Sequence, residues 1–233
     1  MAEAQSRVPL LDMEFLDLLS FTAITTTLGL FLCGIPICRN IARKGNTDGI
    51  SGAPFFLGVI GCLFWLRYGY LKDDSSVITI NGIGAVLQIS YLMFYYTYTR
   101  NKGTLNPGLM FLAGATGAML YYISGLELVD HAKAIDHLGM MCLFFNILGF
   151  AAPLAGLRDV LRSQSTENLP FPLIFTNLLV SIQWFLYGYL ISDAYIKIPN
   201  SVGIGLASLQ LSLFAVYPTR RAHDTYPGSI HVS

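Results

Sequence analysis

Two asparagines and two tryptophans recur at one fixed spacing in this chain. Asn81 and Asn200 lie 119 residues apart, and so do Trp65 and Trp184, which are the chain's two tryptophans. An amide group donates and accepts hydrogen bonds, whereas an indole ring offers a flat apolar face. If the fold brings the four side chains to one level, they suit a neutral solute with many hydroxyl groups, such as a sugar.

Each of these residues also has a purely structural interpretation. An asparagine in an apolar helix can bond across a helix pair, and a tryptophan can belong to the aromatic belt at a membrane surface. An asparagine that faces lipid is costly, so both asparagines should face protein or a cavity. Taken singly, the residues leave solute contact and helix packing open.

The residue types that support enzymatic or metal chemistry form no such set. The four histidines lie outside the apolar stretches: His131, His137, His223 and His231. The four cysteines fall inside apolar runs, where cysteine packs as a small apolar residue: Cys33, Cys38, Cys62 and Cys142. No nucleophile has a base at a suitable spacing, so the sequence predicts neither an enzyme nor a cofactor or metal site.

The elements that must position the asparagines and tryptophans are membrane helices. The chain has 233 residues, 54% hydrophobic and only 12% charged, about half the usual charged fraction of ~25%. Seven stretches approach the roughly 20 apolar residues that a spanning helix needs: Leu18–Cys38, Gly52–Leu71, Ser76–Tyr98, Pro107–Leu126, Leu138–Leu157, Pro170–Ile191 and Ile196–Tyr217. The expected fold class is an all-α membrane protein with seven transmembrane helices. The neutral net charge argues against a nucleic-acid partner.

Basic residues gather on one side of the expected spans. Nine lie in one set of loops and the C-terminal tail: Arg39, Arg43, Lys44, Arg100, Lys102, Arg158, Arg162, Arg220 and Arg221. The other side carries five, with ten of the fourteen acidic residues: Arg7, Arg67, Lys72, Lys133 and Lys197. The positive-inside rule puts the first side in the cytosol. This predicts an outside or lumenal N-terminus and a cytosolic C-terminus, in a plasma or internal membrane.

An internal repeat is the most informative feature of the sequence. A gapless shift of 119 residues aligns Phe31–Tyr98 with Phe150–Tyr217, and matches Arg39 with Arg158 as well as the tryptophans and asparagines. Three-span units joined directly would face opposite ways, and the unmatched fourth span restores a common direction. The expected plan is 3+1+3: an N-terminal tail (1–17), a three-helix repeat (18–98), a linker with the fourth helix (99–134), a second repeat (135–217) and a C-terminal tail (218–233).

The ordered motifs resemble those of one transporter family. They are Asn46–Pro54, Trp65–Gly69, Thr79–Gly82, Ala152–Leu154, Gln164–Thr166 and Ile198–Asn200. In this 3+1+3 order the chain resembles the SWEET sugar transporters, and is more similar to animal than to plant members. The resemblance implies passive transport of mono- or disaccharides without ion coupling. With the twofold match, it favours substrate contact for Asn81, Asn200, Trp65 and Trp184.

The resemblance also implies further residues of the substrate pocket. Deeper in the membrane they are Thr27, Leu30, Gly61, Asn146, Gly149 and Val180. The two glycines either enlarge the pocket or allow close helix packing. Asn146 is bulky for its place in the family pattern, which favours a monosaccharide such as glucose.

Helix breakers near the cytosolic side match the family's inner hinge: Gly34, Pro54, Pro153 and Pro170. A proline within a helix removes a backbone bond and permits a kink. Gly34 stands where the repeat and the family lead one to expect a proline, and Pro36 is displaced by two residues. For Pro54 and Pro170, simple helix initiation is the alternative.

Charged and tyrosine side chains at the outer rim match the family's extracellular gate: Tyr68, Lys72, Asp73, Tyr187 and Asp193. A Lys72–Asp193 pair would close the path in one state. Exposed ion pairs contribute only about 0–1 kcal/mol, which suits a reversible latch. Solvated loop charges are the alternative.

The expected function is facilitated, bidirectional sugar uniport by alternating access. The charged residues inside the expected spans are Arg67, near the end of the second, and Lys197, at the entrance of the last. Neither is an acid, whereas ion-coupled carriers usually hold an acid at depth. The alternatives are a PQ-loop-type exporter of another small solute and a seven-span receptor. The expected partners are a small sugar and membrane lipid, and lipid-facing helix surfaces leave homo-oligomerisation open.

Overall fold

The computed structural model describes residues 10–219, which form helices and short connections. The elements in chain order are α1 (Leu10–Phe31), α2 (Gly34–Lys44), α3 (Ala53–Lys72), α4 (Ser75–Tyr98), η1 (Lys102–Thr104), α5 (Asn106–Val129), α6 (His131–Gly149), α7 (Ala151–Ser163), α8 (Phe171–Leu190) and α9 (Ala194–Val216). Within the described part of the chain, seven helical segments are long and apolar enough to cross a membrane. The predicted fold class is confirmed. Most of the two predicted tails, with Arg7, Arg220 and Arg221, lies outside the described residues.

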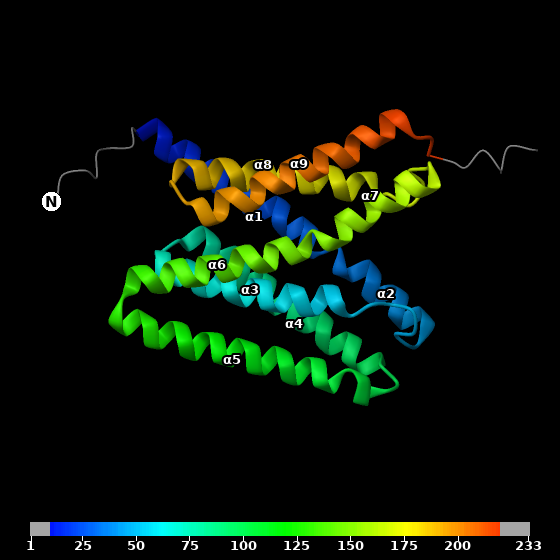
Figure 1. The fold of residues 1–233 in the computed structure, drawn as a ribbon, viewed down its shortest axis with the longest axis horizontal. Coiled ribbons are helices and arrows are strands. Elements are labelled where there is room, and N and C mark those ends of the chain that lie inside the picture. The colour runs from blue at the N-terminus through cyan, green and yellow to red at the C-terminus, as the bar shows by residue number, and fades with distance from the viewer. Residues whose placement is uncertain (1–9, 220–233) are drawn as a thin grey trace, which may run out of the picture.

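The membrane-spanning helices pack as two three-helix units. The linker helix α5 runs along one edge of the molecule (Figure 1). In the first unit α4 packs against α1 and α3, and in the second α9 packs against α6 and α8. The units meet through α1 against α8 and α3 against α6. These two interfaces are equivalent under the repeat. The linker helix α5 packs on α6 and α3, and so lies on the outside of the bundle.

The first and fifth spans are each broken, although the sequence predicted continuous helices. α1 ends at Phe31 and α2 begins at Gly34, while α6 ends at Gly149 and α7 begins at Ala151. Pro36 and Pro153 are the third residues of α2 and α7. Neither proline has the N–H that would continue the preceding helix. The breaks therefore occur at nearly matched places in the two repeats.

Two helix hairpins have the same tight contact. The α3–α4 and α8–α9 hairpins make the closest helix pairs in the molecule. A Cβ atom on Gly69 would lie 3.0 Å from the backbone nitrogen of Ile78, and one on Gly188 would lie 2.9 Å from that of Lys197. Only glycine permits this approach of two helix backbones. We call the end with these two turns the outer end, and the end with α2 and α7 the inner end.

The outside of the bundle is strongly apolar, as a lipid-facing surface requires. On α5 the exposed fractions of Tyr121, Leu128 and Met110 are 85%, 89% and 74%. Arg67 on α3, near the outer end, pairs with Glu127 on α5. This ion pair attaches the linker helix to the first repeat.

Candidate solute-binding site

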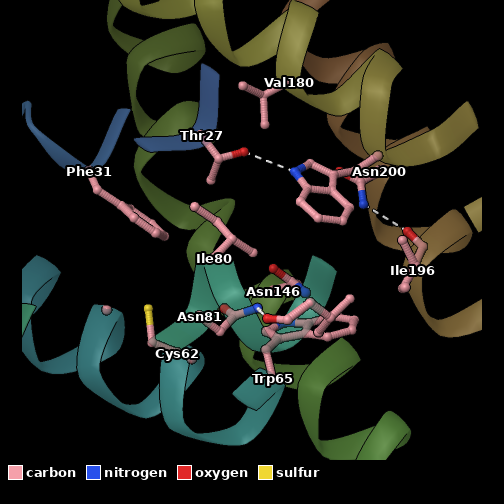
Figure 2. Close-up of a pocket in the computed structure, with 14 residues that line it drawn as sticks. Thr27, Phe31, Cys62, Trp65, Ile80, Asn81, Asn146, Val180, Ile196 and Asn200 are labelled. Atoms are coloured by element: carbon pink, nitrogen blue, oxygen red, sulfur yellow. Dashed lines mark hydrogen bonds between the residues drawn. The ribbon is translucent and has the colours of Figure 1, made fainter. Parts of the chain in front are cut away.

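A cavity of about 270 Å³ lies between the two three-helix units. Its lining comes from α1, α3, α4, α6, α8 and α9, so both repeats contribute (Figure 2). Eight of the residues expected in the pocket line it: Thr27, Gly61, Trp65, Asn81, Asn146, Val180, Trp184 and Asn200. The four side chains that the repeat had singled out therefore lie around one space.

The two asparagines have the same local geometry. The amide nitrogen of Asn81 donates to the carbonyl of Val77 at 2.9 Å, and that of Asn200 donates to the carbonyl of Ile196 at 2.8 Å. Each bond runs one turn back along the same helix and orients the amide. The amide oxygen and the other N–H have no partner among the described residues, so each asparagine can still donate and accept one hydrogen bond within the cavity.

The two tryptophans differ in their bonding. The Trp184 indole donates to the hydroxyl of Thr27 at 2.9 Å, which joins α8 to α1 (Figure 2). Beside it, Thr26 donates to Gln183 at 2.6 Å. Trp65 and Asn146, the repeat partner of Thr27, line the same cavity without a hydrogen bond between them. Among the described side chains Asn146 has no hydrogen-bond partner, which leaves its amide available to a solute.

Some of the remaining residues expected in the pocket border open space, and others pack against neighbouring side chains. A Cβ atom at Gly61 or Gly149 would meet no atom within 4 Å, so these glycines border open space and serve no tight contact. Gly149, however, lines a second cavity nearer the inner end. Leu30 lines neither cavity and packs among apolar side chains that join α1, α4 and α8. Neither residue lines the central cavity, so contact between substrate and these two residues stays a prediction.

Sequence reasoning missed six lining residues: Phe31, Gly58, Cys62, Val77, Ile80 and Ile196. Five are apolar, and nothing in their type separates them from ordinary packing residues. Phe31 had a usable signal, since it matches Phe150 under the repeat and sits at the break of the first span. All fourteen lining residues are uncharged.

At the outer end two matched contacts cross between the repeats. The Tyr68 hydroxyl on α3 donates to the Asp193 carboxylate at 2.8 Å, and the Tyr187 hydroxyl on α8 donates to the Asp74 carboxylate at 2.9 Å. Tyr68 and Tyr187 also pack edge-on against Trp65 and Trp184, with ring centroids 5.4 and 5.3 Å apart. The tyrosines thus cover the cavity on its outer side.

Each aspartate of these contacts is also the N-cap of a helix. Asp74 accepts a hydrogen bond from the backbone of Val77 and begins α4. Asp193 accepts from the backbones of Tyr195 and Ile196 and begins α9. Capping places each side chain at the positive end of its helix dipole. The same charge can therefore hold a helix start and accept the tyrosine hydrogen bond.

Asp73 and Lys72 do not take equivalent parts in these contacts. Asp73 is the C-cap of α3 with φ 53° and is exposed, and it takes no part in the two crossed contacts, so its role in an outer gate stays a prediction. The aspartate in contact is Asp74, which the repeat had already matched to Asp193. The Lys72 ammonium lies 3.4 Å from the Asp193 carboxylate, as the sequence had led us to expect. Its repeat partner is Ile191, so the second contact has no lysine.

The inner hinge residues all lie at helix starts. Pro54 is the second residue of α3, and Pro170 is the N-cap of α8, so both are at positions where a proline begins a helix. Gly34 and Pro153 follow the breaks in the first and fifth spans. A Cβ atom on Gly34 would lie 2.5 Å from the Tyr91 ring. Gly34 therefore permits a close contact between α2 and α4.

Comparison with known proteins agrees with this architecture. The model of the family described as "Sugar efflux transporter for intercellular exchange" matches twice, at residues 17–103 and 136–222. The two matches are offset by 119 residues at both ends, which is the shift of the internal repeat. Together they cover most of the chain. The chain belongs to the SWEET family of sugar transporters.

Individual SWEET proteins are similar along nearly the whole chain. "Sugar transporter SWEET1" of Caenorhabditis elegans is 46% identical over 88% of this chain and 67% of its own length. The protein of the same name from Drosophila pseudoobscura pseudoobscura is 42% identical over 88% of this chain and 90% of its own. A solved structure of a eukaryotic SWEET transporter is 29% identical with a TM-score of 0.74, covering 86% of this chain and 97% of that one. This protein is thus a multi-pass sugar transporter of the SWEET family.

Proposed function

We propose that this SWEET transporter is a passive, bidirectional uniporter of a hexose such as glucose, working by alternating access. The observation that carries the proposal is the lining of the central cavity. Asn81, Asn200, Trp65 and Trp184 surround it in repeat-matched pairs, and every lining residue is uncharged. The asparagines would bond sugar hydroxyls, and the indoles would stack on the C–H face of the ring.

The size of the cavity favours a single sugar ring. At about 270 Å³ it lies just below the roughly 300–1,000 Å³ of typical small-molecule pockets. Val180 occupies the place that Gly61 leaves open in the other repeat, which narrows one side. Asn146 adds a further amide at the cavity wall. A hexose therefore fits this proposal better than a disaccharide.

The two ends of the bundle supply elements for alternating access. The crossed Tyr–Asp contacts close the outer end, and each joins one repeat to the other. They would break together when the three-helix units separate there. The breaks at Gly34 and Pro153 would let α2 and α7 tilt against α1 and α6 when the inner end closes.

The basic residues support one orientation in the membrane. α2, α7 and the α4–α5 connection carry arginines and lysines at the inner end: Arg39, Arg43, Lys44, Arg100, Lys102, Arg158 and Arg162. By the positive-inside rule this end would face the cytosol, and α1 would begin on the outside or lumenal side.

Glucose uptake into liposomes that contain the purified protein tests the proposal. The initial rate should be the same without a pH gradient and with a gradient of either sign, and internal glucose should rise only to the external concentration. Liposomes with the Asn81→Ala/Asn200→Ala double variant serve as the control for leakage. Uptake that requires a proton gradient would refute passive uniport, and no uptake of any hexose would refute the substrate assignment.

A further inference from the structure

A second cavity lies within the second repeat. It has a volume of about 570 Å³ and lies between α6, α7, α8 and α9. Asn146 lines both this cavity and the central one, so the two are adjacent. From Asn146 the cavity extends past the break between α6 and α7 to Pro170 at the inner end. It therefore lies where a solute from the inner side would approach the central cavity.

Several polar side chains of this inner cavity have no partner within the protein. Asn146, Asn177 and Ser181 make no side-chain hydrogen bond to any residue that the structure describes, although all three lie in membrane-spanning helices. Gln210 donates its amide nitrogen to the Pro153 carbonyl at 3.1 Å, and its amide oxygen has no partner among the same residues. Polar groups at such depth normally face a partner or a water-filled path.

The first repeat fills the equivalent space with side chains. Gly58 replaces Asn177 there, and its Cβ position is 2.6 Å from Gln88, whose own partner in the second repeat is Ala207. In the first repeat the glycine lies on α3 and the long amide side chain on α4, whereas in the second repeat the amide lies on α8 and the small alanine on α9. The first arrangement fills the space between the two helices, and the second leaves it open. The Tyr91 ring takes the place of Gln210 and packs at Gly34.

The aromatic residues at the two breaks show the same difference. A Cβ atom on Gly84 would lie 2.5 Å from the Phe31 ring, whereas one on Gly203 would lie 3.9 Å from the Phe150 ring. Phe150 thus stands back from α9, and the inner cavity occupies the space. The second repeat has amides at Asn146, Asn177 and Gln210, where the first has Thr27, Gly58 and Tyr91, and Gln88 is the amide that fills the first-repeat space.

We propose that the inner cavity is a second monosaccharide subsite, in which Asn146, Asn177, Ser181 and Gln210 bond the hydroxyl groups of a sugar before it moves to or after it leaves the central cavity. This subsite rests on the proposed function, because it assumes that the central cavity carries the sugar. Its amides both donate and accept, so it recognises a neutral polyhydroxyl ring and not an ion. Asn146 is the residue that the sugar would contact at both places.

Thiol labelling at Gly149 tests the subsite in the full chain. Gly149 lines the inner cavity, and a Cβ atom there meets nothing within 4 Å, so Gly149→Cys places a thiol in open space. The substitution is combined with Asn81→Ala and Asn200→Ala, which disable the central site. Modification by N-ethylmaleimide is followed by mass spectrometry of the peptide, so that the native cysteines can remain. Cys33, which is exposed and lines neither cavity, is the internal control.

Glucose should slow the labelling at position 149 but not at Cys33. At a glucose concentration of about twice the dissociation constant the labelling rate should fall about threefold. Binding lowers the rate by a factor of one plus the ratio of the glucose concentration to the dissociation constant. Adding Asn177→Ala should abolish the protection. The neighbouring substitution Thr176→Ala should preserve it, because that hydroxyl bonds the Pro172 carbonyl of its own helix. Glycine betaine at equal osmolality should not protect.

Three results would overturn the subsite: no labelling at position 149, labelling that glucose does not slow, or protection that survives Asn177→Ala. If Gly149→Cys does not elute as folded protein, Ser181→Cys is the second probe, since the equivalent position in the first repeat is already Cys62. The unaltered chain is assayed for glucose transport in parallel. If it transports and no protection is seen, only the subsite fails, whereas absence of transport refutes the proposed function itself.

Discussion

The outer and inner ends of this transporter differ in how closely their contacts follow the internal repeat. At the outer end the repeats form matched contacts, Tyr68 with Asp193 and Tyr187 with Asp74, at nearly equal distances. At the inner end the matched positions have diverged. Gly34 packs on the Tyr91 ring, whereas the Pro153 carbonyl accepts a hydrogen bond from the Gln210 amide. The outer contacts join the two repeats, while the inner contacts lie within each repeat.

This difference shows where symmetry is physically required. Each outer contact joins an element of one repeat to an element of the other, so a change in one repeat must suit the partner repeat. The inner contacts only have to satisfy packing within one three-helix unit, which allows α2 and α7 to differ. Four sets of variants test this comparison, from the largest expected effect to the smallest.

The two asparagines of the central cavity should be equally necessary for transport. Asn81→Ala and Asn200→Ala should each abolish glucose transport, because each removes the amide that the cavity offers on one side. The variants should still fold, since each asparagine bonds only its own helix. Radiolabelled glucose uptake in a transport-deficient cell measures the effect. Normal uptake by either variant would show that the repeat-matched asparagines are structural.

The two tyrosine–aspartate contacts at the outer end should both oppose its opening, but with unequal strength. Tyr68→Phe removes a hydrogen bond to Asp193, which is only 2% exposed, and bonds to charged groups contribute about 1.5–3 kcal/mol. Opening of the outer end should therefore increase at least about tenfold. Labelling of Cys62 by an impermeant maleimide added to intact cells measures it, since Cys62 lines the cavity.

Tyr187→Phe should increase the same labelling less, because Asp74 is more exposed than Asp193. Tyr70→Phe is the matched control, since Tyr70 lies on the same helix as Tyr68 and is 60% exposed. An unchanged labelling rate in Tyr68→Phe would mean that the crossed contacts do not hold the outer end closed.

Alanine substitution at the two inner ends should change the stability of the protein unequally. Gly34→Ala should destabilise the protein by about 1–3 kcal/mol, because the added methyl overlaps the Tyr91 ring. Pro153→Ala should have little effect, since the first turn of α7 needs no intrahelical N–H at that position. Thermal unfolding of purified protein measures both.

Gly29→Ala is the control for the effect of alanine itself in this span, because its Cβ atom would meet nothing within 4 Å. It should leave stability unchanged or raise it slightly. Equal effects of Gly34→Ala and Pro153→Ala would contradict the divergence of the two inner ends.

The smallest effect is expected at the one residue that breaks the outer symmetry. Lys72 is a third exposed, and ion pairs of this kind contribute about 0–1 kcal/mol. Asp193 also keeps its bonds to Tyr68 and to the backbone of α9 when the lysine is removed. Lys72→Ala should therefore raise Cys62 labelling only slightly, and less at high salt than at low salt. An effect as large as that of Tyr68→Phe would make the outer end asymmetric in function.

Much of the central cavity could be predicted because the repeat reports on position as well as residue type. Trp65 and Trp184 matched in one register, and both line the cavity. Val77 and Ile196 line it too, but their type does not separate cavity walls from core. Asp74 accepts the hydrogen bond of Tyr187, and the register of the repeat, which matches Asp74 with Asp193 and Asp73 with Ser192, was the signal that distinguished the two adjacent aspartates.

The amino-acid sequence alone determined the seven apolar spans, their division into two repeats and the pairing of asparagine with tryptophan. The spans follow from the hydropathy of stretches about one helix long, and the repeat follows from the spacing of matched residues, which can be counted along the chain. Only the tertiary structure decided that the first and fifth spans are broken, that the outer contacts cross between the repeats and that an inner cavity lies within the second repeat. Each of these depends on which side chains fill the space between helices, and that space exists only after the helices have packed.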